Sequence, residues 1–180
     1  MLERVLAIVK LDVNAYREVD QDEGLTGQAL VVAIVASLIG GVSGFYTTTQ
    51  LFGEEIARQT AGQWISSAVI GTPIGIAILA GLALLFGKMF GGQGDFMGLF
   101  RSIAFASAPG ALGIIPVVGG LAGLWTLVCG VVAVRESHGI STGQAVVVVL
   151  IPLIVVGILV ALVAVLVGVA LFGAFAGLAG

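Results

Sequence analysis

The sequence predicts an all-α membrane protein, a polytopic helical bundle with five transmembrane helices preceded by a short N-terminal amphipathic helix. The first observation is composition: of 180 residues, 59% are hydrophobic and 9% are charged, and the mean hydropathy is +1.19. Soluble domains average about 25% charged residues, so this chain has too few to cover a water-facing surface. The second observation is that the apolar residues gather into five long runs, and one helical crossing needs ~20 such residues.

Residues 1–27 are expected to form a cytoplasmic arm, and residues 28–180 the five-helix transmembrane domain. Along residues 1–19 the apolar residues recur at three- and four-residue spacings, which indicates one face of a helix. These residues are Leu2, Val5, Leu6, Val9, Val13 and Tyr16. Such a helix lies either in the membrane interface, apolar side down, or against the protein's own cytoplasmic helix ends. The segment lacks the apolar core and cleavage site of a secretory signal.

The five crossings are expected at about residues 28–46, 64–86, 96–115, 117–134 and 145–172. The segments between them hold polar residues, glycines and prolines, which favour turns and helix ends. Five crossings place the two ends of the chain on opposite sides of the membrane.

Local signals refine these crossings. Asp95 directly precedes the third crossing and is a good N-cap for it. Pro73 predicts a kink in the second crossing. The last crossing is twenty-eight residues long, which corresponds to ~42 Å of helix against a hydrocarbon core of ~30 Å. It must therefore tilt, kink at Pro152 or protrude. A polar loop is expected over residues 47–63.

The basic residues predict the orientation, because cytoplasmic segments of membrane proteins carry an excess of lysine and arginine. With the N-terminus inside, the cytoplasmic segments hold Arg4, Lys10, Arg17, Lys88, Arg101 and Arg135. The outside segments hold only Arg58. The N-terminus is therefore expected in the cytoplasm and the C-terminus outside.

The stretch over residues 101–145 organises the rest of the chain. It has no charged residue from 102 to 134, a length sufficient for two crossings, and Pro109 and Pro116 lie near its middle. Proline removes a backbone donor there, and the neighbouring glycines permit dihedrals that other residues avoid. We therefore expect a membrane helical hairpin.

Part of this hairpin carries a family resemblance. The residues are Ser107-Ala108-Pro109, Ile115-Pro116-Val117-Val118-Gly119-Gly120, Trp125 and Arg135-Glu136-Ser137-His138-Gly139-Ile140-Ser141-Thr142. They resemble the core of the Yip family, the Ypt/Rab-interacting integral membrane proteins, in its prokaryotic branch. The resemblance implies a five-helix membrane domain with a cytosolic N-terminus, and the expected location is a prokaryotic cytoplasmic membrane. Eukaryotic relatives bind prenylated Rab GTPases, but their DLYGP-type motif is absent here, where the arm reads Asp20-Gln21-Asp22-Glu23-Gly24.

The candidate interaction or structural residues are Arg101, Pro109, Pro116, Gly119, Gly120, Trp125, Arg135, Glu136 and His138. A charge at membrane depth marks a functional candidate, and Arg101 lies about one and a half turns into the third crossing. Its long stem can also snorkel to the interface, and Asp95 or Glu136, on the same side of the membrane, can pair with it. A lone loop histidine such as His138 is more often plain surface.

Two short motifs suggest intramembrane proteases. Gly41-Val42-Ser43-Gly44 has the GxSG form of a serine nucleophile, which needs a histidine within reach, but His138 is predicted at the opposite membrane face. Gly92-Gln93-Gly94-Asp95 has the GxGD form of an aspartyl protease, which needs a second carboxylate, and no other acidic residue falls inside a crossing. One histidine and one cysteine cannot assemble a usual metal site. We expect no enzymatic activity, no metal and no cofactor.

The leading functional hypothesis is a non-enzymatic membrane protein that acts through protein or lipid interactions, as a membrane-organising or trafficking-like scaffold. The expected partners are membrane lipids and a protein at the cytoplasmic loops. Glycine pairs at four-residue spacing also fit a homo-oligomer. The small net charge of −3 gives no indication of nucleic acid. The alternatives are a small transporter, channel or lipid-moving protein, and an accessory subunit of a larger membrane complex.

Overall fold

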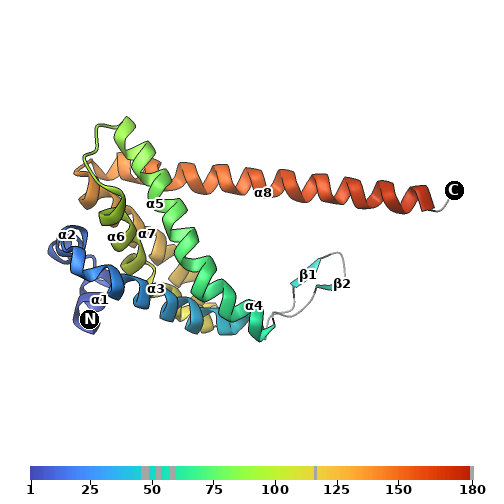
Figure 1. Cartoon of the computed structure of the whole chain (residues 1–180), viewed down its shortest axis with the longest axis horizontal. Coiled ribbons are helices and arrows are strands. Elements are labelled where there is room, and N and C mark those ends of the chain that lie inside the picture. Colours follow the sequence, from blue (N-terminus) through green and yellow to red (C-terminus); the bar gives the residue numbers. More distant parts are fainter. Residues whose placement is uncertain (46–48, 52–53, 57–59, 116, 179–180) are drawn as a thin grey trace. The chain divides into compact units, whose positions relative to one another are not determined.

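The computed structural model describes residues 1–45, 49–51, 54–56, 60–115 and 117–178. Two compact units are present, Met1–Val149 and Leu150–Gly180, and each is described by itself. The elements of the first unit are shown in Figure 1 and are α1 (Leu2–Val9), α2 (Val13–Gln21), η1 (Glu23–Leu25), α3 (Thr26–Gly41), η2 (Val42–Phe45), β1 (Thr49–Leu51), β2 (Glu54–Ile56), α4 (Ala61–Ser66), η3 (Ser67–Gly71), α5 (Thr72–Met89), α6 (Phe96–Ala106), η4 (Ala108–Ile114) and α7 (Val118–His138). Helix α8 (Thr142–Leu178) begins in the first unit and provides the second.

Within the residues that the structure describes, five helical segments are long and apolar enough to cross a membrane. They are Glu23–Gly41, Ala61–Met89, Phe96–Ile114, Val118–His138 and Thr142–Val169. This confirms the predicted all-α membrane bundle of five helices with a short helix at the N-terminus. Helix α6 lies at the centre of the first unit, where it packs against α2, α3, α5 and α7.

The N-terminal arm differs from the single helix expected over residues 1–19, because it folds into two helices. Leu11 adopts a left-handed backbone conformation, with φ 64°, and ends α1. The amide N–H groups of Leu11 and Asp12 turn back to carbonyls of α1, and the Asp12 carboxylate then accepts from the Asn14 N–H at 2.9 Å, which caps α2. The apolar spacing continues across this break, so periodicity alone does not reveal it.

One side of the arm packs on the bundle and another side faces outward. Ile8, Tyr16 and Val19 are fully buried and belong to the main hydrophobic core. Leu2 and Leu6 on α1 are 70% and 49% exposed. The arm therefore packs on the protein, which was one of the two alternatives expected. It also keeps an apolar surface available for the membrane interface, which was the other.

Two predicted segments contain structure that the sequence did not indicate. In the expected polar loop, β1 and β2 form an antiparallel pair in which Gln50 lies opposite Glu55. In the second crossing, η3 is a π-helical turn that directly precedes α5, so the irregularity lies just before Pro73. Pro152 lies inside α8, which continues past it in both directions.

The third crossing is α-helical only as far as Ala106, and η4 continues it as a 3-10 helix that contains Pro109. The predicted turn of the hairpin follows η4. Pro116 lies outside the described residues, and Val117 after it has φ 69°, a conformation that is unusual for a β-branched residue.

Helix α3 approaches η4 through a backbone contact that only glycine permits. A Cβ atom built at Gly40 would lie 2.2 Å from the Gly110 carbonyl oxygen. A Cβ built at Gly113 would lie 3.4 Å from Gly40, and one at Gly119 would lie 3.0 Å from Gly113. Close approach of this kind is how membrane helices associate without a hydrophobic driving force between them.

We expect Gly40→Ala to lower the free energy of unfolding by about 2–3 kcal/mol, the upper range for overpacking of a tight contact. The opposing atom belongs to the backbone, so η4 itself must move. Gly120→Ala is the matched control because nothing lies within 4 Å of a Cβ at that position. Unfolding titrations in mixed detergent micelles measure both, and equal stability of the two variants would contradict the contact.

Candidate functional site

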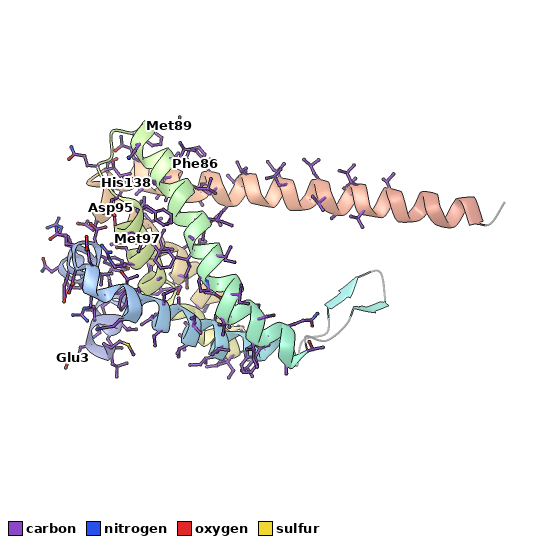
Figure 2. All side chains as sticks on the ribbon, in the orientation of Figure 1. Glu3, Phe86, Met89, Asp95, Met97 and His138 are labelled. Carbon is purple, nitrogen blue, oxygen red and sulfur yellow. The ribbon has the colours of Figure 1, made fainter. Side chains whose placement is uncertain are left out.

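A buried polar cluster joins the arm to the bundle where α2, α6 and α7 meet. Figure 1 shows these three helices at one end of the first unit. The buried polar side chains of the described residues are Arg101, Ser102, Ser137 and His138. Together with Glu136 we call them the arm-junction cluster. Figure 2 shows His138 and Asp95 close to this end of the bundle.

Arg101 holds the C-terminal end of α2. Its side chain is only 3% exposed, its Nε donates to the Val19 carbonyl at 3.0 Å, and its Nη2 donates to the Asp20 carbonyl. The last carbonyls of a helix have no partner within it and carry its partial negative charge. The guanidinium therefore satisfies two of these carbonyls and binds the arm to α6.

The structure does not pair Arg101 with Asp95 or Glu136, the two ion-pair partners that the sequence allows. No salt bridge joins Arg101 to a carboxylate within the described part of the chain. Asp95 instead caps α6, as predicted, because its Oδ1 accepts from the N–H groups of Met97 and Gly98 at 2.9 and 3.0 Å. The physical reason is the fold of the arm, which brings the free carbonyls of α2 onto the guanidinium.

Glu136 forms a second connection between the arm and the bundle. Its Oε2 accepts from Arg17 Nε on α2 at 2.9 Å, and its Oε1 accepts from Arg135 Nε at 2.7 Å. The side chain of Glu136 is largely buried, whereas that of Arg17 is mostly exposed. Arg4 adds a link inside the arm, since it pairs with Glu18 on α2.

His138 is buried at the end of α7, so the expectation of a plain surface histidine is wrong. Its Nε2 lies 3.0 Å from the Ala83 carbonyl oxygen, and its Nδ1 accepts from the Gly94 N–H at 3.2 Å. A ring nitrogen that accepts from an amide carries no proton, so Nε2 is the donor to Ala83. The imidazole thus connects α7 to α5 and to the segment before α6.

Three glycines make the space for this ring. A Cβ atom would lie 2.2 Å from His138 Nε2 if built at Gly87, 2.5 Å from Nδ1 if built at Gly92, and 2.9 Å from Nδ1 if built at Gly94. The glycine-rich segment over residues 87–95 therefore encloses the imidazole tightly. We call it the glycine cage.

The sequence did not identify the contribution of the arm's own buried groups. The Tyr16 hydroxyl donates to the Ile8 carbonyl at 3.1 Å and connects α2 to α1. Burial, together with the neighbouring Cys129, raises the pKa of Tyr16, so the hydroxyl stays protonated and able to donate.

A second buried hydrogen bond joins α6 to α7, where the Ser137 hydroxyl donates to the Ser102 hydroxyl at 3.3 Å. These pairs are distant in sequence, and no spacing signals them.

The fold also brings a second carboxylate close to Asp95, which the sequence did not predict. A Cβ atom built at Gly98 would lie 2.5 Å from Asp20 Oδ1 and 2.9 Å from Asp95 Oδ2. Asp20 Oδ1 is buried without a hydrogen-bond partner among the described residues. Asp95 uses its other oxygen as the helix cap, and the backbone of Asp20 is bound by Arg101.

Ser43 and His138, the residues considered for a serine protease, make hydrogen bonds to the backbone. Ser43 donates to the Gly40 carbonyl at 3.0 Å, and both ring nitrogens of His138 have backbone partners. Among the residues that the structure describes, no group of three histidine, cysteine, aspartate or glutamate side chains lies close enough to hold a metal ion.

The other candidate residues lie away from the arm-junction cluster. Pro109 and Trp125 line one apolar groove, and the Trp125 indole N–H donates to the Val9 carbonyl at 2.9 Å. Gly119 packs against Gly113, while Gly120 has open space around it. The structure thus gathers Arg101, Arg135, Glu136 and His138 at one end, and groups Pro109 with Trp125 elsewhere.

Five membrane-spanning helices with an arm hydrogen-bonded to one end define an integral membrane protein of the polytopic helical class. A family profile described as the Yip1 domain matches residues 12–165. The chain therefore belongs to the Yip1 domain family, which confirms the family predicted from the hairpin, while its prokaryotic branch stays a prediction. The match begins at the cap of α2, so the family unit includes this helix of the arm.

No curated protein and no solved structure matches the chain. The membership therefore rests on the family profile, together with the five-helix architecture. It supports an integral membrane protein that contacts lipid along its spanning helices.

Proposed function

We propose that this protein acts without catalysis, as a membrane-embedded docking platform that presents α2 to a protein partner. The observation that carries the proposal is how firmly α2 is fixed. Arg101 holds its C-terminal carbonyls, Glu136 holds Arg17, and the buried Tyr16 holds α1 against it. A rigid surface loses little conformational entropy when a partner binds, which favours affinity.

The outward face of α2 supplies the contacts that a partner requires. Its exposed residues are Asn14, Arg17, Glu18 and Gln21, at spacings that place them on one side of the helix. Ala15, Tyr16 and Val19 occupy the opposite, buried side. The exposed side is a mixed polar and charged stripe of the kind that gives specificity to a protein interface.

The orientation that we propose places this stripe in the cytoplasm and the C-terminus outside. The support is the excess of basic residues in the segments that the predicted topology places on the same side of the membrane as the N-terminus. A prokaryotic cytoplasmic membrane is the location that we propose, on the resemblance to that branch of the family.

The non-catalytic part of the proposal is supported by how the reactive side chains are used. His138, Ser43 and Asp95 each have a hydrogen-bond partner in the backbone. Arg101 serves the carbonyls of α2 rather than an open pocket. These four side chains are thus used in packing the bundle and its arm, whereas Asp20 Oδ1, beside Asp95, is buried without a hydrogen-bond partner among the described residues.

Site-specific photo-crosslinking in intact cells tests the docking surface. A photoreactive residue in place of Gln21, on the stripe, is expected to give one reproducible protein adduct that excess unlabelled protein suppresses. The same residue in place of Thr60, the exposed N-cap of α4, is the matched control and is expected to give no such adduct. Equal labelling from the two positions, or lipid adducts alone at both, would reject α2 as the docking surface.

A further inference from the structure

An apolar groove of about 430 Å³ lies between α1, η4 and α7. Its walls include Val5 and Val9 from the arm, Pro109 and Leu112 from η4, and Leu121 and Trp125 from α7. Every lining side chain is that of valine, alanine, proline, leucine or tryptophan. The one polar group among them, the Trp125 indole N–H, already donates to the Val9 carbonyl at 2.9 Å. A ligand in this groove must therefore be apolar.

The outer wall of the groove faces the surroundings of the protein. Leu112, Leu121 and Trp125 are 48%, 65% and 42% exposed. Leu112 belongs to the third membrane-spanning segment, and Leu121 and Trp125 belong to the fourth. In a membrane, what meets such a wall is lipid. The groove has the volume of a small-molecule site, for which 300–1,000 Å³ is usual, and is too small for a helix of a second copy.

The residue that follows the lining residue Val9 in the sequence is a lysine, Lys10. Lys10 is exposed, and its side-chain ammonium has no hydrogen-bond or ion-pair partner in the described residues. Arg4, Arg17 and Arg135 are all in ion pairs, so Lys10 differs from them. The exposed Leu2 and Leu6 make α1 amphipathic, a pattern that places a helix at the interface where phosphate groups lie.

We propose that the groove binds one acyl chain of an anionic glycerophospholipid and that Lys10 contacts the phosphate of the same lipid. An apolar slot with a free ammonium beside it complements an apolar tail joined to a negative headgroup. This site goes beyond the docking function, because it uses α1, η4 and α7 rather than the outward stripe of α2. It adds one specifically bound lipid to the proposed complex of this protein with its docking partner.

Native mass spectrometry of the full chain, released from nanodiscs of equal phosphatidylglycerol and phosphatidylcholine, tests the proposal. The wild-type protein is expected to retain one phosphatidylglycerol. Lys10→Gln is expected to reduce the preference for phosphatidylglycerol about fivefold, the effect of one lysine beside an anionic headgroup. Ala111→Phe fills the groove and is expected to remove the retained lipid. The matched controls are Lys88→Gln and Ala164→Phe, both at exposed positions that do not line the groove, and both should behave as wild type.

A second measurement does not depend on a filled groove. Trp64→Phe leaves Trp125 as the single tryptophan, and phospholipids brominated on the acyl chain quench its fluorescence on contact. Brominated phosphatidylglycerol is expected to quench more strongly than brominated phosphatidylcholine at equal mole fraction. Equal quenching, or lipid retention unchanged by Lys10→Gln and Ala111→Phe, would overturn the proposal.

A dimer that Ala111→Phe dissociates would also overturn it, because it would assign the groove to a second copy. Crosslinking from Gln21 should persist in Ala111→Phe, so the two proposals fail separately.

Discussion

Replacing Arg101 by alanine is expected to lower the free energy of unfolding by about 3–5 kcal/mol, because it removes two hydrogen bonds from a charged donor, each of which contributes about 1.5–3 kcal/mol. The Val19 and Asp20 carbonyls lose their donors at a site that water does not reach freely. The cost is therefore the desolvation of these groups in addition to the lost hydrogen bonds. Unfolding titrations in mixed detergent micelles measure the change.

The same substitution should release the arm, which trypsin reports independently. Cleavage after Arg17 is expected to accelerate at least tenfold, because α2 no longer has its carbonyls bound to α6. Arg101→Lys should recover only part of the stability, since an ammonium lacks the planar fork that reaches two carbonyls at once. The control is Lys88→Ala, which removes an exposed cation that has no ion-pair partner among the described residues, with an expected loss below about 1 kcal/mol. Wild-type stability and cleavage in Arg101→Ala would show that other contacts fix the arm.

The helix count and the membrane class were predictable from the sequence because the signals for them are local. Each crossing is a run of apolar residues of the length that a bilayer imposes. The cap of α6 at Asp95 also depends only on the next three residues. Local chemistry decides these features before any tertiary contact forms.

The contacts of the arm-junction cluster were not predictable because they depend on where distant segments meet. The partner of Arg101 is the end of α2, some eighty residues earlier in the chain. That meeting follows from the break at Leu11, a left-handed residue with no glycine to signal it. The sequence interpretation therefore looked for a carboxylate partner, whereas the fold supplied two carbonyls.

The glycine cage shows the same limit. Glycines near Asp95 indicate a flexible turn when the segment is considered alone. In the fold, glycine is needed at these positions because the ring of His138, more than forty residues later, occupies the space that larger side chains would fill. A single histidine offers no periodicity and no motif, so its burial is visible only once α5 and α7 are placed together.

His138→Ala is expected to lower the free energy of unfolding by about 3 kcal/mol. The substitution empties the glycine cage and leaves the Gly94 N–H and the Ala83 carbonyl without their partner. Loss of a large buried side chain and loss of satisfied polar groups each destabilise a core. Gly87→Ala is expected to cost about 2–3 kcal/mol for the opposite reason, since its Cβ would lie 2.2 Å from His138 Nε2.

The double variant separates this contact from general loss of packing. With the imidazole removed, the new methyl group of Gly87→Ala occupies vacated space, so the two losses should not add. We expect a coupling free energy of about 1–3 kcal/mol from the cycle, as for residues in direct contact. Gly75→Ala on the same helix is the matched control, because a Cβ there meets nothing within 4 Å and alanine favours the helix by about 1 kcal/mol. Additive losses in the double variant would mean that the imidazole and Gly87 do not touch, and that α7 is fixed to α5 by other contacts.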